Sequence, residues 1–333
     1  MKIVALVDVE TVFPEDPDFS GKTPEIKQTV EFQVITALRV LQHDVVVQTF
    51  GPDPLVSARS VVDHKPELIF NLTEHFQGNR RQDANIAGLL ELMNLPFTGT
   101  GAEGLLLCRD KITAKRLLGY HKIRVPMFFS LDPGEASIPK RIHFPLMVKP
   151  AHEDGSDGIS LASIVKDAED LKARIAMIHE RMNQPALCEE YIEGRELYVG
   201  IAGNERLTAY PAREIRFGKT DEGGPQIATR KVKWDEEYRK KWAIEYVHAD
   251  LPPALERAVA RASKRIYRIL QMRDYGRIDL RLKADGEIVF LESNPNPNLG
   301  REEDLAEAAK KSGVEYEALI DRIVKSAGAR YKR

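Results

Sequence analysis

Two short segments near the end of the sequence carry four polar side chains at a spacing of two residues. Arg277 and Asp279 lie in the first segment, and Glu292 and Asn294 lie in the second. The residues between the segments include Asp-Gly, which is a strong signal for a β-hairpin turn. Because strand side chains alternate with a period of two, each pair shares one face of its strand. The pattern therefore predicts a hairpin that gathers a guanidinium, two carboxylates and a carboxamide in one small volume.

These oxygen donors suit one kind of metal ion. Two carboxylates and a carboxamide leave room for phosphate oxygens, which is typical of Mg²⁺ bound together with a nucleotide. The same pattern also occurs in charged hairpins that only face solvent. Groups elsewhere in the sequence that could bind phosphate would favour the metal site.

A second segment could supply such groups. Lys149 lies at the end of an apolar run at 145–150, and a polar loop with Gly155, Ser156 and Gly158 follows. Glycines allow close backbone approach, so the loop N–H groups and the serine hydroxyl could hold phosphate oxygens. The order differs from that of a Walker A loop, because the lysine precedes the glycines. Two adjacent acids at 153–154 disfavour an anion, and a plain surface turn is the competing interpretation.

Two acids further along could bind the rest of a nucleotide. Glu189 lies near the end of a strand-like run at 186–191, and Glu196 follows the turn at Gly194. Their carboxylates could accept hydrogen bonds from an adenine amino group and a ribose hydroxyl. A charged hairpin turn explains the same residues equally well.

The composition limits the class of protein. With 333 residues, 43% of them hydrophobic and 30% charged, the chain can form two or three domains with full cores. Its formal net charge is −2 and its charges are interspersed, so nothing indicates nucleic acid as a partner. Cys108 and Cys188 lack metal-ligand spacing and indicate ordinary thiols in a reducing compartment. No run is long enough for a membrane span or a signal peptide. We therefore expect a cytoplasmic protein without nucleic-acid or membrane contacts.

The first hundred residues alternate between strand and helix patterns. Strands are expected at 2–7, 45–49 and 68–71, and helices at 24–42, 54–64 and 83–93. This alternation predicts a parallel sheet of the doubly wound type. Beyond it, helices are expected at 105–118, 167–182, 253–271 and 302–326, and strands at 127–131, 145–150, 186–191 and 197–202. We predict three α/β units, with bounds 1–104, 105–185 and 186–333.

Taken together and in this order, the motifs resemble the ATP-grasp superfamily and, within it, the D-alanine–D-alanine ligase group. The resemblance spans the segments 83–101, 109–111, 145–160, 189–199 and 275–294. It implies an α/β fold in which a doubly wound parallel domain precedes two ATP-grasp subdomains. It also implies an ATP-dependent ligase that joins a carboxylate to an amine through an acyl phosphate. ATP and Mg²⁺, or alternatively Mn²⁺, would be its cofactors.

The resemblance also assigns roles to individual residues. The groups that hold the nucleotide phosphates would be Lys111, Lys149, Gly155, Ser156 and Gly158. The groups that surround adenine and ribose would be Glu189, Tyr191, Ile192 and Glu196. The metal ligands would be Asp279, Glu292 and Asn294. Arg277 would stabilise the tetrahedral oxyanion, and Lys233, or less favourably Lys231, would reach the γ-phosphate from a mobile loop.

The half of the pattern that would bind the amino acids departs from the D-alanine ligases. The segment 8–20 lacks the glycines that follow the group's first strand, and 71–83 replaces its His-Gly and Gly-Glu-Asp-Gly stretch. Gly155 replaces a second loop serine, and a backbone donor to the oxyanion would come from Asn298. We therefore expect amino acid or peptide substrates other than two D-alanines. The candidate contacts are Glu10, Glu74, His75, Arg80, Arg81 and Asn298.

Two further expectations follow from the resemblance. A homodimer would form through the N-terminal domain. The alternative function is that of an altered ATP-grasp protein, either a phosphotransferase or a nucleotide-binding regulator. A phosphotransferase would leave a stable phosphorylated product, whereas a regulator would bind ATP without turnover.

Overall fold

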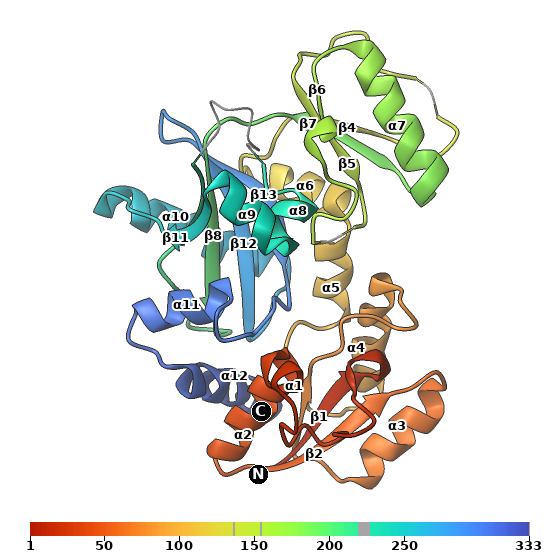
Figure 1. Cartoon of the computed structure of the whole chain (residues 1–333), viewed down its shortest axis with the longest axis vertical. Helices are drawn as coiled ribbons and strands as arrows, with labels where there is room; N and C mark the ends of the chain where they lie inside the picture. The colour runs from red at the N-terminus through yellow and green to blue at the C-terminus, as the bar shows by residue number, and fades with distance from the viewer. Residues whose placement is uncertain (136, 154, 219–226, 333) are drawn as a thin grey trace.

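The structure, a computed structural model, describes residues 1–135, 137–153, 155–218 and 227–332, apart from the side chain of Trp234. It contains three sheets, which lie one after another along the chain (Figure 1). The first sheet is parallel, and the other two are antiparallel. The predicted fold class, with a doubly wound parallel domain first, is confirmed.

The first sheet has the strand order β2-β1-β3. Its strands are β1 (Lys2–Asp8), β2 (Asp44–Phe50) and β3 (Leu68–Asn71). Its helices are α1 (Pro24–Gln28), α2 (Val30–Val40), α3 (Pro54–Asp63) and α4 (Asp83–Leu92), with 3₁₀ turns at Val9–Thr11 and Arg80–Gln82. The residues of β1 from Ile3 to Val7 are fully buried, because helices cover both faces of the sheet.

The prediction of one helix at 24–42 was wrong. Thr29 is extended (φ −70°, ψ 149°), and its hydroxyl accepts a hydrogen bond from Phe32 N at 3.3 Å. Thr29 therefore ends α1 and caps α2, since an N-cap residue must leave the helical conformation.

The central sheet has the strand order β4-β7-β5-β6. Its strands are β4 (Phe128–Leu131), β5 (Leu146–Pro150), β6 (Ile164–Val165) and β7 (Ala186–Glu190). The preceding helices are α5 (Ala102–Arg109) and α6 (Lys111–Tyr120), and a 3₁₀ turn at Leu161–Ser163 and α7 (Ala168–Met182) complete the unit. The helix predicted at 105–118 is divided at Asp110, whose carboxylate accepts hydrogen bonds from Ile112 N and Thr113 N at 3.0 Å each. This cap begins α6 directly at Lys111.

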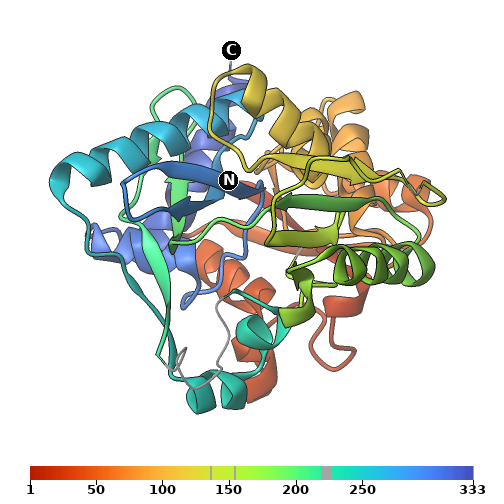
Figure 2. The same ribbon diagram turned by 90° about the horizontal axis from the view of Figure 1, so that it is seen from above.

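The third sheet has six strands in the order β11-β10-β8-β12-β13, with β9 paired to β8. Its strands are β8 (Arg195–Ala202), β9 (Thr208–Ala209), β10 (Arg213–Phe217), β11 (Ile244–His248), β12 (Tyr275–Leu282) and β13 (Ile288–Asn294). The associated helices are α8 (Arg230–Trp234), α9 (Glu236–Trp242), α10 (Pro253–Ile269), α11 (Asp304–Lys311) and α12 (Tyr316–Tyr331). Figure 2 shows α10 lying along the hairpin of β12 and β13.

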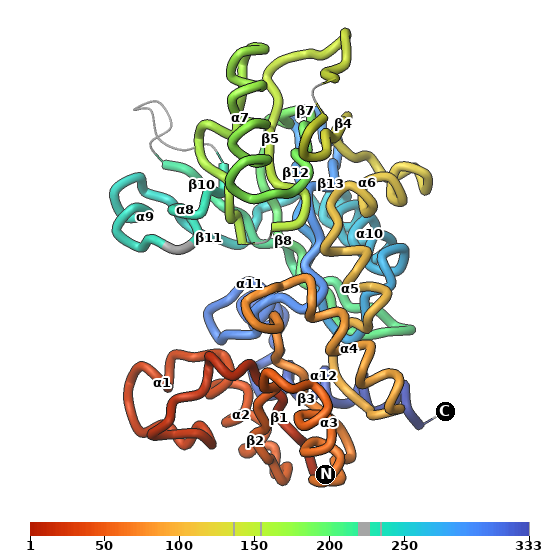
Figure 3. Tube along the Cα trace, turned by 90° about the vertical axis from the view of Figure 1, so that its right-hand side faces the viewer, coloured from red at the N-terminus to blue at the C-terminus, as the bar shows by residue number. Residues whose placement is uncertain are grey.

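The last helix returns to the first sheet. The helix predicted at 302–326 is two helices, because the chain turns at Gly313, which has a φ of 76°. Leu319, Ile320 and Ile323 of α12 pack in one core cluster with residues of α2, β1 and β3. Figures 1 and 3 both show α12 beside α2. None of the helices in the described part of the chain is long and apolar enough to cross a membrane.

Candidate active site

Two cavities meet between the three sheets. The first encloses about 630 Å³, counting the part that is open to solvent, and lies between the central and the third sheet. The second encloses about 1430 Å³ on the same basis and also reaches residues of the first unit, such as Thr73 and Glu74. Lys233 lines both cavities. The two cavities are therefore neighbours at this residue.

The hairpin of β12 and β13 forms the floor shared by the two cavities. Arg277 pairs with Asn294, and Asp279 pairs with Glu292, so the predicted hairpin is confirmed. The register of the two strands shifts between Asp279 and Leu280. Arg277 donates hydrogen bonds to both carboxylate oxygens of Asp279, at 2.8 and 3.0 Å, and Asn294 Nδ2 donates to Asp279 Oδ2 at 3.1 Å. Asp279 and Glu292 line the first cavity, whereas Arg277 and Asn294 line the second.

Arg277 also connects the hairpin to α11. Its NH1 lies 3.3 Å from Asp304 Oδ2, and its guanidinium lies 5.1 Å from the centre of the Tyr198 ring. Burial raises the pKa of Asp279, and the guanidinium of Arg277 offsets part of that rise. The pair is therefore held firmly in one geometry at the junction of the cavities.

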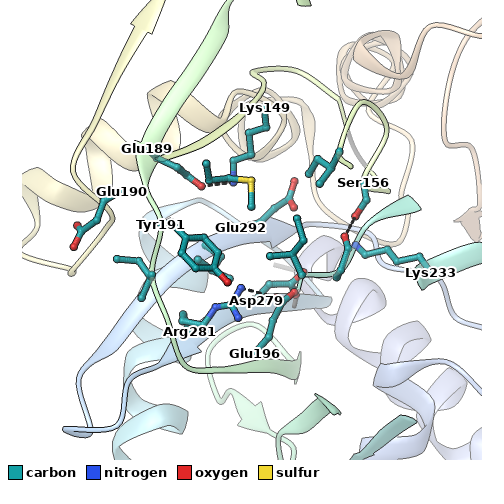
Figure 4. Close-up of a pocket in the computed structure, with 16 residues that line it drawn as sticks. Lys149, Ser156, Glu189, Glu190, Tyr191, Glu196, Lys233, Asp279, Arg281 and Glu292 are labelled. Carbon is teal, nitrogen blue, oxygen red and sulfur yellow. Dashed lines mark hydrogen bonds and ion pairs between the residues drawn. The ribbon is translucent and has the colours of Figure 1, made fainter. Parts of the chain in front are cut away.

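Two lysines hold the buried carboxylate of Glu189. Lys149 Nζ lies 2.5 Å from Glu189 Oε1, and Lys115 Nζ lies 3.2 Å from Glu189 Oε2 (Figure 4 labels Lys149 and Glu189). Burial alone would raise the pKa of Glu189, but the two lysines lower it below its usual value. Burial lowers the pKa of Lys115 to about 8, against the pull of Glu189. Lys115 Nζ also donates to the carbonyl of Leu291 at 2.8 Å, which ties α6 to β13.

Glu292 forms an ion pair with a different lysine. Lys111 Nζ lies 2.8 Å from Glu292 Oε1 and also donates to the carbonyl of Glu153 in the loop after β5. The lining of the first cavity contains three cations, Lys149, Lys233 and Arg281, and five carboxylates, Glu189, Glu190, Glu196, Asp279 and Glu292. Lys111 and Lys115 pair with two of these carboxylates from outside the lining. With Lys111 and Lys115 included, the five cations balance the five carboxylates, and the lysine ammonium groups are the ones that can contact an anionic ligand such as a polyphosphate.

Glu196 is fixed at the opposite wall. Arg281 NH2 donates to Glu196 Oε2 at 2.9 Å, and the hydroxyl of Tyr198 donates to Glu196 Oε1 at 2.8 Å. Gly194 makes the turn before β8 with a φ of 140°, and a Cβ there would lie 2.2 Å from the carbonyl oxygen of Leu282. Only glycine fits this approach of the two backbones, which sets where Glu196 enters the cavity.

The loop after β5 closes over the first cavity. Gly155, Ser156 and Gly158 have φ values of 60°, 66° and 72°, and Ser156 is an uncommon non-glycine residue in this region. The hydroxyl of Ser156 donates to the carbonyl of Ala228 at 2.7 Å, just before α8 (Figure 4). This hydrogen bond joins the loop to the segment that carries Lys233.

Lys231, in contrast, is exposed, lines neither cavity and lies 5.9 Å from the centre of the Tyr238 ring, so the geometry favours Lys233.

The predicted residues divide by position. Those lining the first cavity are Lys149, Ser156, Glu189, Tyr191, Ile192, Glu196, Lys233, Asp279 and Glu292. Those lining the second are Gly155, Glu74, Arg80, Lys233, Arg277, Asn294 and Asn298. Among the described residues, Lys111 and Gly158 line neither cavity, and Lys111 pairs with Glu292 of the first cavity's lining.

Three predicted substrate contacts, Glu10, His75 and Arg81, line neither cavity. Glu10 and Arg81 are exposed on 3₁₀ turns. His75 Nε2 instead lies 3.7 Å from Asp8 Oδ2, and its Nδ1 accepts a hydrogen bond from Gly78 N at 3.3 Å. Glu74 and Arg80 thus line the second cavity, whereas their sequence neighbours His75 and Arg81 do not. In an irregular loop, residue spacing does not predict the direction of a side chain.

Sequence reasoning missed several residues of the site. Lys115 lies four residues after Lys111 and therefore on the same face of α6, and Arg281 lies two residues after Asp279 on the same face of β12, so periodicity could have found both. Arg213, Arg239 and Asp304 also line the second cavity. Their segments carry no local signal, because only the packing of α9, β10 and α11 brings them together.

The fold and the site define a class of protein. A parallel domain followed by two antiparallel sheets, with lysines, acids and a glycine-containing loop around a cavity between the sheets, is the arrangement of an ATP-grasp protein. The family model described as "D-ala D-ala ligase C-terminus" matches residues 129–325. The chain therefore belongs to the D-alanine–D-alanine ligase family, a family of ATP-dependent ligases, and the predicted resemblance and enzyme class are confirmed.

Individual proteins support this assignment. A D-alanine–D-alanine ligase of Bordetella petrii is 32% identical over 256 residues, which cover 76% of this chain and 74% of that protein. The uncharacterized protein y4sG of Sinorhizobium fredii is 32% identical over 289 residues, covering 84% of this chain and 78% of its own. The crystal structure of D-alanine–D-alanine ligase from Bacillus anthracis matches with a TM-score of 0.77 at 21% identity, covering 100% of this chain and 99% of that one. The same enzyme complexed with ATP matches with a TM-score of 0.74.

Proposed function

We propose that this protein is an ATP-dependent ligase that joins a carboxylate to an amine through an acyl phosphate. The observation that carries the proposal is the junction of the two cavities at Lys233, directly beside the hairpin that bears Arg277 and Asp279. Phosphoryl transfer between an ATP in the first cavity and a carboxylate in the second requires such a junction, because the reacting oxygens must be in line.

The first cavity would hold ATP. Glu189, Tyr191, Ile192 and Glu196 line its one end and would surround adenine and ribose. Lys149 and Lys111, together with the loop from Gly155 to Gly158, would hold the phosphates, and Lys233 would contact the γ-phosphate. The ion pairs of Lys111 with Glu292 and of Lys149 with Glu189 place both ammonium groups at this cavity, which supports that orientation.

The residues of the hairpin fit Mg²⁺. Asp279, Glu292 and Asn294 provide hard oxygen donors, and Mn²⁺ accepts the same donors. In the described residues no group of three or more His, Cys, Asp or Glu side chains gathers. When bound, the ion would neutralise charge on the transferring phosphoryl group.

The chain's own residues would then carry out the transfer to the amine. A substrate carboxylate attacks the γ-phosphate to give an acyl phosphate and ADP, and an amine attacks the acyl carbon. The fork of Arg277 faces the second cavity and would stabilise the developing oxyanion, with the backbone of Asn298 as a further donor. The hydrogen bond from Ser156 to Ala228 keeps the loop closed, which protects the acyl phosphate from water.

The second cavity supports substrates other than two D-alanines. Its lining contains Glu74, Glu302, Glu303 and Asp304 as well as Arg80, Arg109, Arg213, Arg239 and Arg277. Charged groups of both signs suit a substrate with several ionised groups, such as a charged amino acid or a peptide.

The test is ADP release with Mg²⁺-ATP against a panel of L- and D-amino acids, dipeptides and polyamines. The expected result is stimulation by one pair of substrates and an amide product by mass spectrometry. Glu292→Ala serves as the blank. A stable phosphorylated product would instead indicate a phosphotransferase, and ATP binding without turnover on any member of the panel would indicate a regulator.

A further inference from the structure

Amide formation from an acyl phosphate has a requirement that the residues described so far do not meet. An amine is nucleophilic only when its nitrogen carries a free electron pair, and most amines are protonated at neutral pH. The attacking ammonium group must therefore lose a proton inside the second cavity. A carboxylate that faces this cavity and is not held by a cation is the simplest acceptor for it.

The carboxylates of the second cavity differ in their availability. Asp304 is held by two arginines, with Arg213 Nε at 3.2 Å and Arg277 NH1 at 3.3 Å. Glu74 and Glu302 are exposed to solvent. Glu303 is mostly shielded from solvent, and among the described residues its side chain has no hydrogen bond or ion pair.

Glu303 lies in the wall of the second cavity, at the start of α11. It is the N-cap residue of α11 but makes no side-chain cap hydrogen bond. A Cβ built on Gly300 would lie 3.1 Å from Glu303 Cγ and 3.2 Å from Asn298 Oδ1, so the side chains of Glu303 and Asn298 flank the same turn. Both residues line the second cavity together with Arg277.

The charges around Glu303 come from four elements. Burial raises the pKa of its carboxyl, and Asp304 of α11 adds to this rise. Arg277 of β12, Arg213 of β10 and Arg239 of α9 offset part of the rise. A carboxylate with a raised pKa is a stronger base than an exposed one.

We propose that Glu303 is the general base that deprotonates the acceptor amine, an inference that rests on the proposed ligase function. One N–H proton of the ammonium group passes to the carboxylate of Glu303. The freed electron pair forms the C–N bond, and the bond from the acyl carbon to the phosphate oxygen breaks, with its electron pair leaving on the phosphate. The second proton lost by the nitrogen goes to the departing phosphate.

The test compares two nucleophiles in Glu303→Gln. Hydroxylamine is largely unprotonated at neutral pH and needs no base, so hydroxamate formation reports the acyl phosphate alone. The second nucleophile is the amino acid of the panel that gives the highest wild-type rate. We expect amide formation at pH 7 to fall by about 10²–10⁴-fold and hydroxamate formation to change by less than about threefold. The amide rate of the variant should recover with rising pH, following the acceptor's own ionisation.

The matched control is Glu315→Gln. Glu315 is likewise a glutamate at an N-cap without a side-chain cap hydrogen bond, but it lies at the start of α12, outside the lining of both cavities. Equal losses of amide and hydroxamate in Glu303→Gln would overturn the proposal, as would an unchanged amide rate or a raised KM for the amine with an unaltered pH profile. Absence of hydroxamate in the wild-type protein with every carboxylate of the panel would refute the ligase function itself.

Discussion

Replacement of Arg277 by lysine separates the geometry of the guanidinium from its charge. Arg277 donates two hydrogen bonds to Asp279, at 2.8 and 3.0 Å, and lies 3.3 Å from Asp304. A lysine keeps the positive charge but not the planar fork, so it cannot hold both carboxylates and also face the acyl carbon. Loss of one donor to an oxyanion costs roughly 10²–10³-fold in kcat. We expect a loss of this size in Arg277→Lys, with the KM for ATP changed by less than about threefold.

Arg281→Lys is the matched control on the same strand. Arg281 is also buried, and it donates to Glu196 Oε2 at 2.9 Å and to the carbonyl of Gly194 at 3.0 Å, but it lines the nucleotide cavity. Its replacement should raise the KM for ATP by about tenfold, equivalent to roughly 1.4 kcal/mol, and affect kcat much less. The assay is steady-state ADP release with each substrate varied in turn. A wild-type kcat in Arg277→Lys, or the same pattern of change in both variants, would refute the role given to Arg277.

Three further changes test other parts of the structure. Lys115→Met removes one of the two lysines on Glu189 and should raise the KM for ATP by about tenfold in the same assay, since half of the support for that carboxylate is lost; an unchanged KM would contradict the positioning role. Burial raises the pKa of Asp8 to about 6, above its unfolded value, so its contribution to stability is present below about pH 4 and is lost as the pH rises through 6. The wild-type protein should therefore lose unfolding free energy between pH 4 and pH 7. In Asp8→Asn this loss should be smaller by about 1–3 kcal/mol, as measured by urea titrations at the two pH values. An unaltered pH dependence would show that this carboxyl is not responsible. Gly194→Ala should lower the Tm far more than Gly286→Ala. Both glycines have a positive φ, but a Cβ would meet a strand carbonyl only at Gly194. Equal Tm shifts in calorimetry would rule out the steric explanation.

Local sequence patterns determined the two strands and the turn of the hairpin at 275–294. The two-residue spacing of Arg277 and Asp279, and of Glu292 and Asn294, fixed which side chains share a face, and Asp285-Gly286 fixed the turn. Covalent spacing and turn chemistry are local properties, so the shared faces and the turn could be read without a fold, whereas the register shift between Asp279 and Leu280 could not. The breaks at Thr29 and Asp110 were missed, although both residues are good caps, because a continuous apolar face hides a change in helix direction.

Only the tertiary structure decided which charges meet. Lys115 of α6 reaches Glu189 of β7 and the backbone of β13, and the protonation of both groups depends on this burial. Asp304 is held by Arg213 of β10 and Arg277 of β12, whereas Glu303, the other partly shielded acid among the described residues of that wall, has no such partner. Such contacts join residues that are distant in sequence, and desolvation depends on everything that packs around a group. The sequence by itself therefore determined the family and the hairpin that carries Arg277, Asp279, Glu292 and Asn294, whereas packing determined which charged groups pair with one another.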